Sequence, residues 1–168
     1  MGIEKTLQRA EVFLGLDNRD LSSIAALPSC REETYQPGEV IFRAGDEARY
    51  LYVLKAGQVD IVMLAPPKSN QAATSVVVDR VTTGGFFGWS ALVGPHFYVM
   101  SAICQEPSQV VVISGAELMA LFDKEHHIGY RVFQSLARII GTRLRDMEQV
   151  LVRGQRWPFL EKQKNVQG

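Results

Sequence analysis

Apolar positions along this chain change their spacing twice. Over residues 6–27, and again over 115–152, they recur every three or four positions, which predicts helices. Between these segments, residues 31–113 form short alternating runs separated by glycine turns, which predicts strands. We therefore expect one mainly β domain over residues 1–152, in which N-terminal and C-terminal helices flank an antiparallel β-barrel, followed by a tail at 153–168.

The N-terminal segment predicts two helices. Residues 7–16 place apolar side chains at largely helical spacings and predict the first. Asp17 is suited to cap a second helix, with Asp20 at its favourable acidic end, and Pro28 ends it.

The central segment predicts strands that surround a glycine-rich stretch. Valine-rich residues 75–81 and 109–113 are expected to be strands on either side of it, and they can close a barrel of the jelly-roll kind. Residues 65–75 are polar and contain two prolines, so we expect an exposed hairpin loop there.

The C-terminal segment predicts a short helix and then a long one. Ser114 and Glu117 have the capping-box spacing, in which the serine accepts a helix N–H and the glutamate reaches back. Residues 126–152 predict one helix of about 39 Å, too long to lie wholly on a small barrel. Its apolar stripe comprises Ile128, Val132, Leu136, Ile139, Ile140, Leu144, Met147 and Leu151. Part of this stripe must meet another chain, another protein or its own domain after a bend.

Composition excludes several classes of protein. The 168 residues carry 18 basic and 18 acidic side chains, so no global field attracts the chain to nucleic acid or an anionic membrane. Cys30 and Cys104 lack metal-site spacing and suit a reducing compartment. The chain begins without an apolar leader and contains no run of about 18 apolar residues, so we expect a soluble cytoplasmic protein that does not enter a membrane.

Residues 84–104 have the pattern of a binding site. Gly84, Gly85 and Gly88 permit positive φ or close approach of the backbone to a ligand. Residues 89–92 can form one helical turn whose free N–H groups point outward and attract an anion. The same glycines can instead start an ordinary loop around a core built from Phe86, Phe87 and Leu92.

Two sets of motifs resemble the cyclic nucleotide-binding domain family over about residues 12–150. The barrel signature reads Tyr35-x-Pro37-Gly38-Glu39-x-Ile41-Phe42, then Gly45-Asp46, then Leu51-Tyr52-x-Leu54-x-x-Gly57-x-Val59-x-Ile61. The second set, Phe87-Gly88-x-x-Ala91-Leu92 followed by Ser101-Ala102-x-Cys104, is similar to the family's phosphate-binding cassette.

The resemblance implies a ligand site with two altered contacts. Its expected residues are Gly85, Phe87, Gly88, Trp89, Ser90, Ala91, Leu92, Met100, Ser101 and Ala102. Trp89 stands where the family places the glutamate that binds the ribose, and Met100 stands where it places the arginine that clamps the cyclic phosphate. Loss of that charge-assisted pair should weaken binding of cyclic AMP or cyclic GMP by about ten- to a hundredfold. Arg49, Arg80 or an arginine of the long helix could replace the clamp.

The resemblance also implies an output. In the family, the helix corresponding to 126–152 closes over the ligand and forms a parallel dimer seam, so we expect a homodimer. The stretch after Gly154 is too short for the helix-turn-helix domain of related transcription activators, so we expect no DNA binding.

Two alternatives to a cyclic nucleotide ligand remain open. The side chains of Phe86, Phe87, Trp89, Phe97, Tyr98 and Met100 suit a pocket retuned for an apolar or aromatic small molecule. Alternatively, Trp89 and Met100 fill the vacated site, leaving a ligand-free dimeric scaffold for protein interaction. We expect a regulatory sensing module and no tightly held cofactor.

Catalysis is not expected. The chain has three histidines, and the adjacent His126 and His127 diverge by about 100° on a helix, so they do not form a metal site with His96. Cys104 lies in a predicted strand and is expected to be a buried structural thiol.

Overall fold

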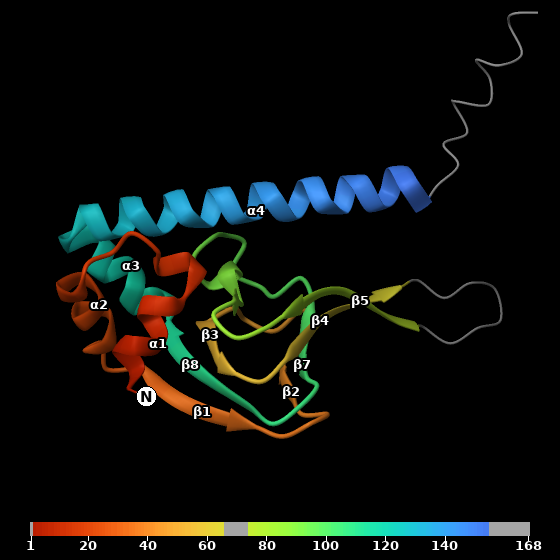
Figure 1. Cartoon of the computed structure of the whole chain (residues 1–168), viewed down its shortest axis with the longest axis horizontal. Coiled ribbons are helices and arrows are strands. Elements are labelled where there is room, and N and C mark those ends of the chain that lie inside the picture. The colour runs from red at the N-terminus through yellow and green to blue at the C-terminus, as the bar shows by residue number, and fades with distance from the viewer. Residues whose placement is uncertain (1, 66–73, 155–168) are drawn as a thin grey trace, which may run out of the picture.

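The structure is a computed structural model that describes residues 2–65 and 74–154 (Figure 1). Most of the predicted loop at 65–75 and almost all of the predicted tail at 153–168 lie outside the described residues. The helices are α1 (Ile3–Arg9), η1 (Glu11–Phe13), α2 (Asn18–Ala25), η2 (Trp89–Ala91), α3 (Gly115–Lys124) and α4 (His126–Gly154). The strands are β1 (Arg31–Tyr35), β2 (Val40–Phe42), β3 (Tyr50–Ala56), β4 (Val59–Ala65), β5 (Thr74–Val81), β6 (Phe86–Phe87), β7 (Ser101–Cys104) and β8 (Ser108–Ser114).

The strands form two antiparallel four-stranded sheets, in the orders β1-β8-β3-β6 and β2-β7-β4-β5. This is the jelly-roll arrangement, and it confirms the predicted mainly β fold with helices at both ends of the chain. The predicted strands at 75–81 and 109–113 correspond to β5 and β8.

The inner strands β3 and β8 of the first sheet are buried on both faces, which explains their nearly continuous apolar sequences. In β3, Leu51 and Val53 pack into the cluster that contains the helices, whereas Tyr52 and Leu54 pack into the barrel interior. Successive side chains of a strand point to opposite faces, so the same division recurs along β8. The molecule therefore has a helical layer, a central sheet and an outer sheet.

The predicted helix at 7–16 is wrong in its boundaries. Helix α1 ends at Arg9, and Ala10 adopts an extended backbone with ψ of 126°. The N–H of Glu11 then donates to the carbonyl oxygen of Gly84 at 3.0 Å, so a bond to the barrel replaces the next helical bond. The break allows Leu7, Ala10, Val12 and Phe13 to be buried together, which one regular helix would not.

The predicted helix caps are confirmed at α2 and half wrong at α3. The Asp17 carboxylate accepts the N–H of Arg19 and Asp20, and the Asp20 carboxylate accepts the N–H of Asp17. At α3 the Ser114 hydroxyl accepts the N–H of Glu117 at 3.3 Å, as predicted.

The Glu117 carboxylate does not reach back to the backbone of Ser114. It accepts the Ser29 hydroxyl at 2.6 Å, and the Ser29 oxygen accepts the Ser114 N–H at 2.9 Å. Ser29, which is distant in sequence, has thus replaced Glu117 as the acceptor of the Ser114 N–H in the predicted capping box.

Helix α4 extends past the barrel, as its length predicts. Its 29 residues correspond to about 43 Å. Ile128, Val132 and Leu136 are buried against the domain, whereas Leu144 and Val152 are 56% and 67% exposed. Figure 1 shows the second half of α4 projecting in the same direction as the β4–β5 hairpin. Among the helices that the structure describes, none has the length and apolar character needed to span a bilayer.

Candidate functional site

The glycine-rich segment forms a tight turn between β6 and η2. Phe86 and Phe87 of β6 pair with Val53 and Tyr52 of β3. Gly88 follows with φ of 76°, and a Cβ at this position would lie 2.8 Å from the carbonyl oxygen of Tyr50. Only glycine meets both requirements without strain. We call residues 85–92 with 100–102 the cassette.

The predicted outward-facing amides of the cassette turn are partly wrong. The helical turn is present as η2, but the N–H of Ala91 donates to Gly88 at 3.0 Å and that of Leu92 donates to Trp89 at 2.9 Å. The Ser101 hydroxyl accepts the N–H of Ala44 at 2.9 Å. Several polar groups expected to meet a phosphate therefore bond to the chain itself.

Four aromatic side chains fill the barrel interior behind the cassette. The rings of Phe42 and Tyr98 stack with centroids 3.7 Å apart, and those of Tyr52 and Phe87 stack at 5.1 Å. The two pairs touch through Phe42, whose centroid lies 5.6 Å from Tyr52 and 6.0 Å from Phe87. All four side chains are less than 9% exposed, so the interior at this level is a packed core.

Tyr98 is held by hydrogen bonds as well as by stacking. Its hydroxyl donates to the carbonyl oxygen of Tyr50 at 2.8 Å and accepts the N–H of the same residue at 3.2 Å. Burial raises the pKa of the Tyr98 hydroxyl, and it likewise raises the pKa of Tyr52. Both hydroxyls thus stay protonated at neutral pH and bring no negative charge into the barrel.

The six side chains proposed to line a retuned pocket do not gather in one place. Phe87 and Tyr98 face the barrel interior, whereas Phe86 and the half-buried Trp89 pack against the helical cluster. Phe97 is 53% exposed. Met100 is half-buried at the end of the turn that precedes β7.

Two further predicted site residues lie in different elements. Ala102 is fully buried in the barrel interior, and Ser90 is half-buried in η2.

Three of the arginines considered as replacements for the clamp, Arg49, Arg80 and Arg143, are paired with carboxylates. Arg49 contacts Glu47 at 2.6 Å on the surface. Arg80 donates to both oxygens of the buried Asp60, at 2.7 and 3.0 Å. Arg143 of α4 contacts Glu11 at 3.3 Å and Asp79 at 3.2 Å.

His126 and His127 have structural partners. His126 Nδ1 lies 3.1 Å from the carbonyl oxygen of Phe122, and His127 Nε2 lies 2.8 Å from Asp20. His96 lies in the loop between η2 and β7 and has a positive φ of 63°. Within residues 2–65 and 74–154, no three His, Cys, Asp or Glu side chains group as a metal site. Burial raises the pKa of the Cys30 thiol to about 11, so it is not a reactive thiolate at neutral pH.

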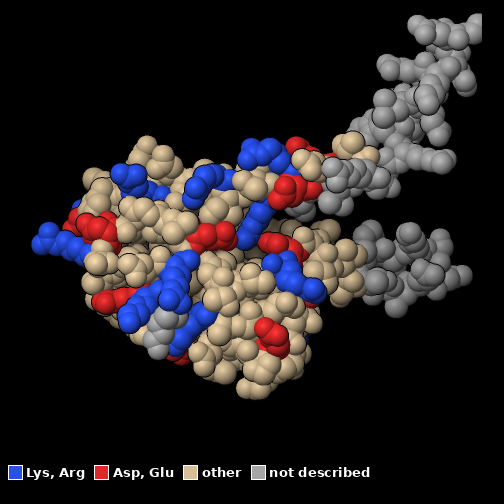
Figure 2. Space-filling view, viewed as in Figure 1, with Lys and Arg blue, Asp and Glu red and all other residues tan. Residues whose placement is uncertain are grey.

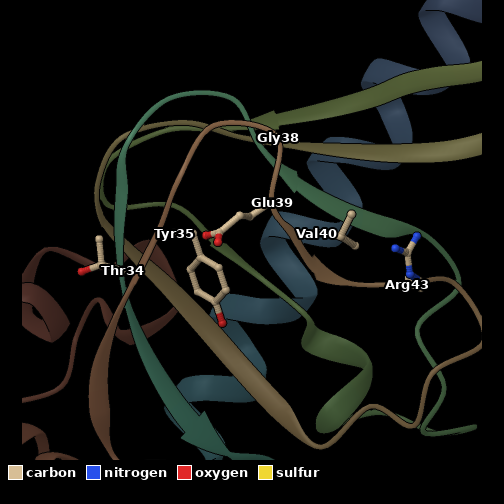
Figure 3. Close-up of a pocket in the computed structure, with 6 residues that line it drawn as sticks. All are labelled: Thr34, Tyr35, Gly38, Glu39, Val40 and Arg43. Carbon is tan, nitrogen blue, oxygen red and sulfur yellow. The ribbon is translucent and has the colours of Figure 1, made fainter.

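Two cavities were not predicted from the sequence. The first, of about 500 Å³, is an open groove beside β1 and β2 (Figure 3). Its Glu39 carboxylate accepts the N–H of Gln36 at 2.6 Å, and Figure 3 shows Arg43 at the far end of the groove, apart from Glu39. The Tyr35 hydroxyl donates to Glu33, outside the set of lining residues. The groove therefore lacks convergent polar groups.

The second cavity has a volume of about 370 Å³ and lies where η1, the turn between β5 and β6, and α4 meet. Three arginines line it, namely Arg9, Arg80 and Arg143, together with Glu11 and residues 81–85. Sequence spacing could not reveal this cavity, because its arginines come from three elements far apart in the chain.

Comparison with known proteins identifies the domain type. A family model described as the cyclic nucleotide-binding domain matches residues 32–125, more than half of the chain. Among curated sequences, a “Putative potassium channel protein” of Rhodopseudomonas palustris is 27% identical over 136 residues. That match covers 81% of this chain but 31% of the relative, so the chain spans about a third of the length of this relative.

Solved structures share the fold. A “Putative Cyclic nucleotide-binding protein” from Geobacter metallireducens is 28% identical with a TM-score of 0.67, over 86% of this chain and 99% of that one. A cyclic nucleotide-binding domain from Methylobacillus flagellatus is 17% identical with a TM-score of 0.78, over 92% of this chain and 86% of that one.

Proposed function

Because this chain belongs to the cyclic nucleotide-binding domain family, we propose that it is a regulatory module in which the cassette and helix α4 move together. Domains of this type are usually non-catalytic regulators. The proposed output is a change in the docking of α4 on the barrel, transmitted to a second copy of the chain. The proposed input is a ligand that acts on the cassette or on the elements that contact it.

The observation that carries this proposal is the close packing of α3 between the cassette and α4. Gly115, the first residue of α3, lies so near the cassette turn that a Cβ there would be 2.4 Å from the carbonyl oxygen of Ala91. At the other end, a Cβ on Gly129 of α4 would be 2.8 Å from the Cβ of Phe122 in α3. Closely packed interiors transmit displacements instead of absorbing them. A shift of the cassette turn is therefore expected to move α3, and through it the start of α4.

Hydrogen–deuterium exchange of alanine variants tests this coupling. Gly115→Ala forces the cassette turn and α3 apart, and Gly129→Ala forces α3 and α4 apart. We expect Gly115→Ala to raise exchange in residues 126–136 as well as in the cassette, because the displacement passes through α3. Gly141→Ala is the matched control, since a Cβ there would lie 3.9 Å from its nearest neighbour, Nη1 of Arg145. An effect of Gly115→Ala confined to the cassette would overturn the proposal.

We propose that the barrel side of the cassette does not bind cyclic AMP or cyclic GMP. Trp89 and Met100 supply neither a carboxylate for the ribose nor a cation for the phosphate. A desolvated phosphate without a paired cation is costly. The stacked Phe42, Tyr52, Phe87 and Tyr98 support the same conclusion, because they pack the barrel interior behind the cassette.

The proposed partner of α4 is the α4 helix of a second copy. Leu144 is 56% exposed beyond the barrel, and Ile140, Leu144, Met147 and Leu151 follow one another at spacings of four, three and four residues. This spacing is typical of a two-stranded coiled-coil seam.

A cytoplasmic location, expected from the composition, stays a prediction.

A ligand-free dimeric scaffold is the second candidate function, and the filled barrel interior favours it. The two functions differ in one measurable respect. A sensor changes the exchange of α4 when its ligand is added, whereas a scaffold does not.

A further inference from the structure

The cavity beneath α4 collects positive charge from three separate elements. Arg9 comes from α1, Arg80 from β5 and Arg143 from α4, and the cavity also contains the hydroxyl-bearing residues Thr82 and Thr83. Glu11 is the single carboxylate among its lining residues. Figure 2 shows basic and acidic side chains gathered around the hollow between α4 and the barrel. We call this cavity the arginine cleft.

The arginines of the cleft differ in how firmly they are held. Arg80 makes a bidentate contact with Asp60, whose side chain is 4% exposed, so it is fixed in place. Arg143 has weaker partners, because its contacts to Glu11 and Asp79 are 3.3 and 3.2 Å long. Charge-assisted hydrogen bonds of this type are usually about 2.7–2.9 Å. Arg9 is exposed, and no ion pair involves it within the described part of the chain.

Arg143 also connects α4 to the rest of the domain. Its guanidinium joins η1 through Glu11 and β5 through Asp79, and lies 5.3 Å from the ring centroid of Phe86 in β6. Beyond Arg143, every α4 residue whose side-chain exposure is described is exposed to solvent. Arg143 is therefore placed at the point where α4 leaves the barrel.

We propose that the arginine cleft binds the phosphate group of a small phosphate monoester, and that this phosphate competes with Glu11 and Asp79 for Arg143. Two negative charges on one group suit the guanidinium groups of Arg9 and Arg143, with Arg80 fixed beside them and threonine hydroxyls as further donors. The cavity volume of about 370 Å³ is at the small end of the range for metabolite sites. The cleft is separate from the aromatic-filled barrel interior.

Phosphate binding in the cleft is also expected to change the packing of α4, a consequence that rests on the function proposed above. Once a phosphate occupies Arg143, the bonds from α4 to η1 and β5 are lost, and the projecting half of α4 becomes free to change its packing. The turn at residues 82–85, which lines the cleft, leads directly into the cassette. Binding in the cleft is thus expected to alter both the cassette and α4.

Titration with inorganic phosphate at constant ionic strength, followed by amide NMR, tests the site. We expect saturable shifts of residues 82–85, and Arg9→Gln and Arg143→Gln should each weaken binding by about tenfold or more. Arg49→Gln is the matched control, because Arg49 is also paired with a glutamate but does not line the cleft. Equal effects of all three variants, or no saturable shift, would overturn the site.

Glu11→Gln gives an effect of opposite sign. This change removes one of the two carboxylates that compete for Arg143, so it should tighten phosphate binding several-fold. A residue that merely supports the fold would weaken binding when changed, as Arg143→Gln does. Weaker binding to Glu11→Gln would therefore contradict the competition.

The two proposals can fail separately. If phosphate binds in the cleft but hydrogen exchange of residues 138–152 stays unchanged, the site stands and its coupling to α4 is wrong. If phosphate does not bind while Gly115→Ala still affects α4, the regulatory proposal stands and the cleft is not its input.

Discussion

At the scale of single residues, Tyr98 combines aromatic stacking with hydrogen bonding in the barrel interior. Its ring stacks on Phe42, and its hydroxyl satisfies both the N–H and the carbonyl oxygen of Tyr50. One side chain thus fills space in the barrel and connects the loop between η2 and β7 to the start of β3.

We predict that Tyr98→Phe lowers the free energy of unfolding by about 2 kcal/mol. The ring is kept, but the N–H and the carbonyl oxygen of Tyr50 lose their hydrogen-bond partner. Each such loss costs about 1–3 kcal/mol, and the lower end applies because both groups are only partly buried. Urea unfolding measures the change. Tyr130→Phe is the control, because Tyr130 is 66% exposed and its change should be nearly neutral. Equal stability of both variants would mean that the Tyr98 hydroxyl bonds contribute nothing.

The sequence predicted two altered contacts of the site, but it did not predict the aromatic rings behind the cassette. Trp89 and Met100 stand out because a motif fixes their positions. The four stacked aromatic rings come from β2, β3, β6 and the loop before β7, and no spacing in the sequence brings these segments together. One of the two alternatives to a cyclic nucleotide ligand has Trp89 fill the site, but Trp89 packs against the helical cluster instead, because Gly88 turns the chain between Phe87 and Trp89.

At the scale of elements, α4 combines a buried half and a projecting half. Its periodicity predicted both its extent and its excess length, because a helical stripe is a local property of the sequence. The break after α1 was not predicted, since it depends on a bond from Glu11 to Gly84, a residue distant in sequence. The Glu117–Ser29 contact was missed for the same reason.

We predict that Leu144→Glu converts a homodimer into a monomer. A carboxylate at this exposed apolar position would lie in the proposed seam. The partner helix would bury it without a compensating charge, which destabilises the dimer. Light scattering after size-exclusion chromatography, at micromolar concentration, measures the mass. Gln149→Glu is the control, since Gln149 is exposed and about 140° around the helix from Leu144. A wild-type monomer, or a dimer that survives Leu144→Glu, would contradict the proposed seam.

At the scale of the whole molecule, three layers place the cassette between the helices and the outer sheet. Alternating side chains of β3 and β8 bury both faces of the central sheet. The order of turns and strands, together with the family resemblance, predicted a jelly-roll barrel with flanking helices, because glycine turns and alternating runs are local signals that follow one another in the chain. The arginine cleft was not predicted, because it exists only where three elements meet.

We propose that this chain keeps the fold of the family while its nucleotide site is closed. Calorimetric titration of cyclic AMP and cyclic GMP, into the wild type and a Trp89→Glu/Met100→Arg double variant, tests it most directly. We predict no binding to the wild type up to millimolar nucleotide, and none to the double variant, because the stacked rings still fill the barrel. Binding by the double variant alone would show that the missing charges, and not the rings, close the site. Micromolar binding by the wild type would contradict the claim.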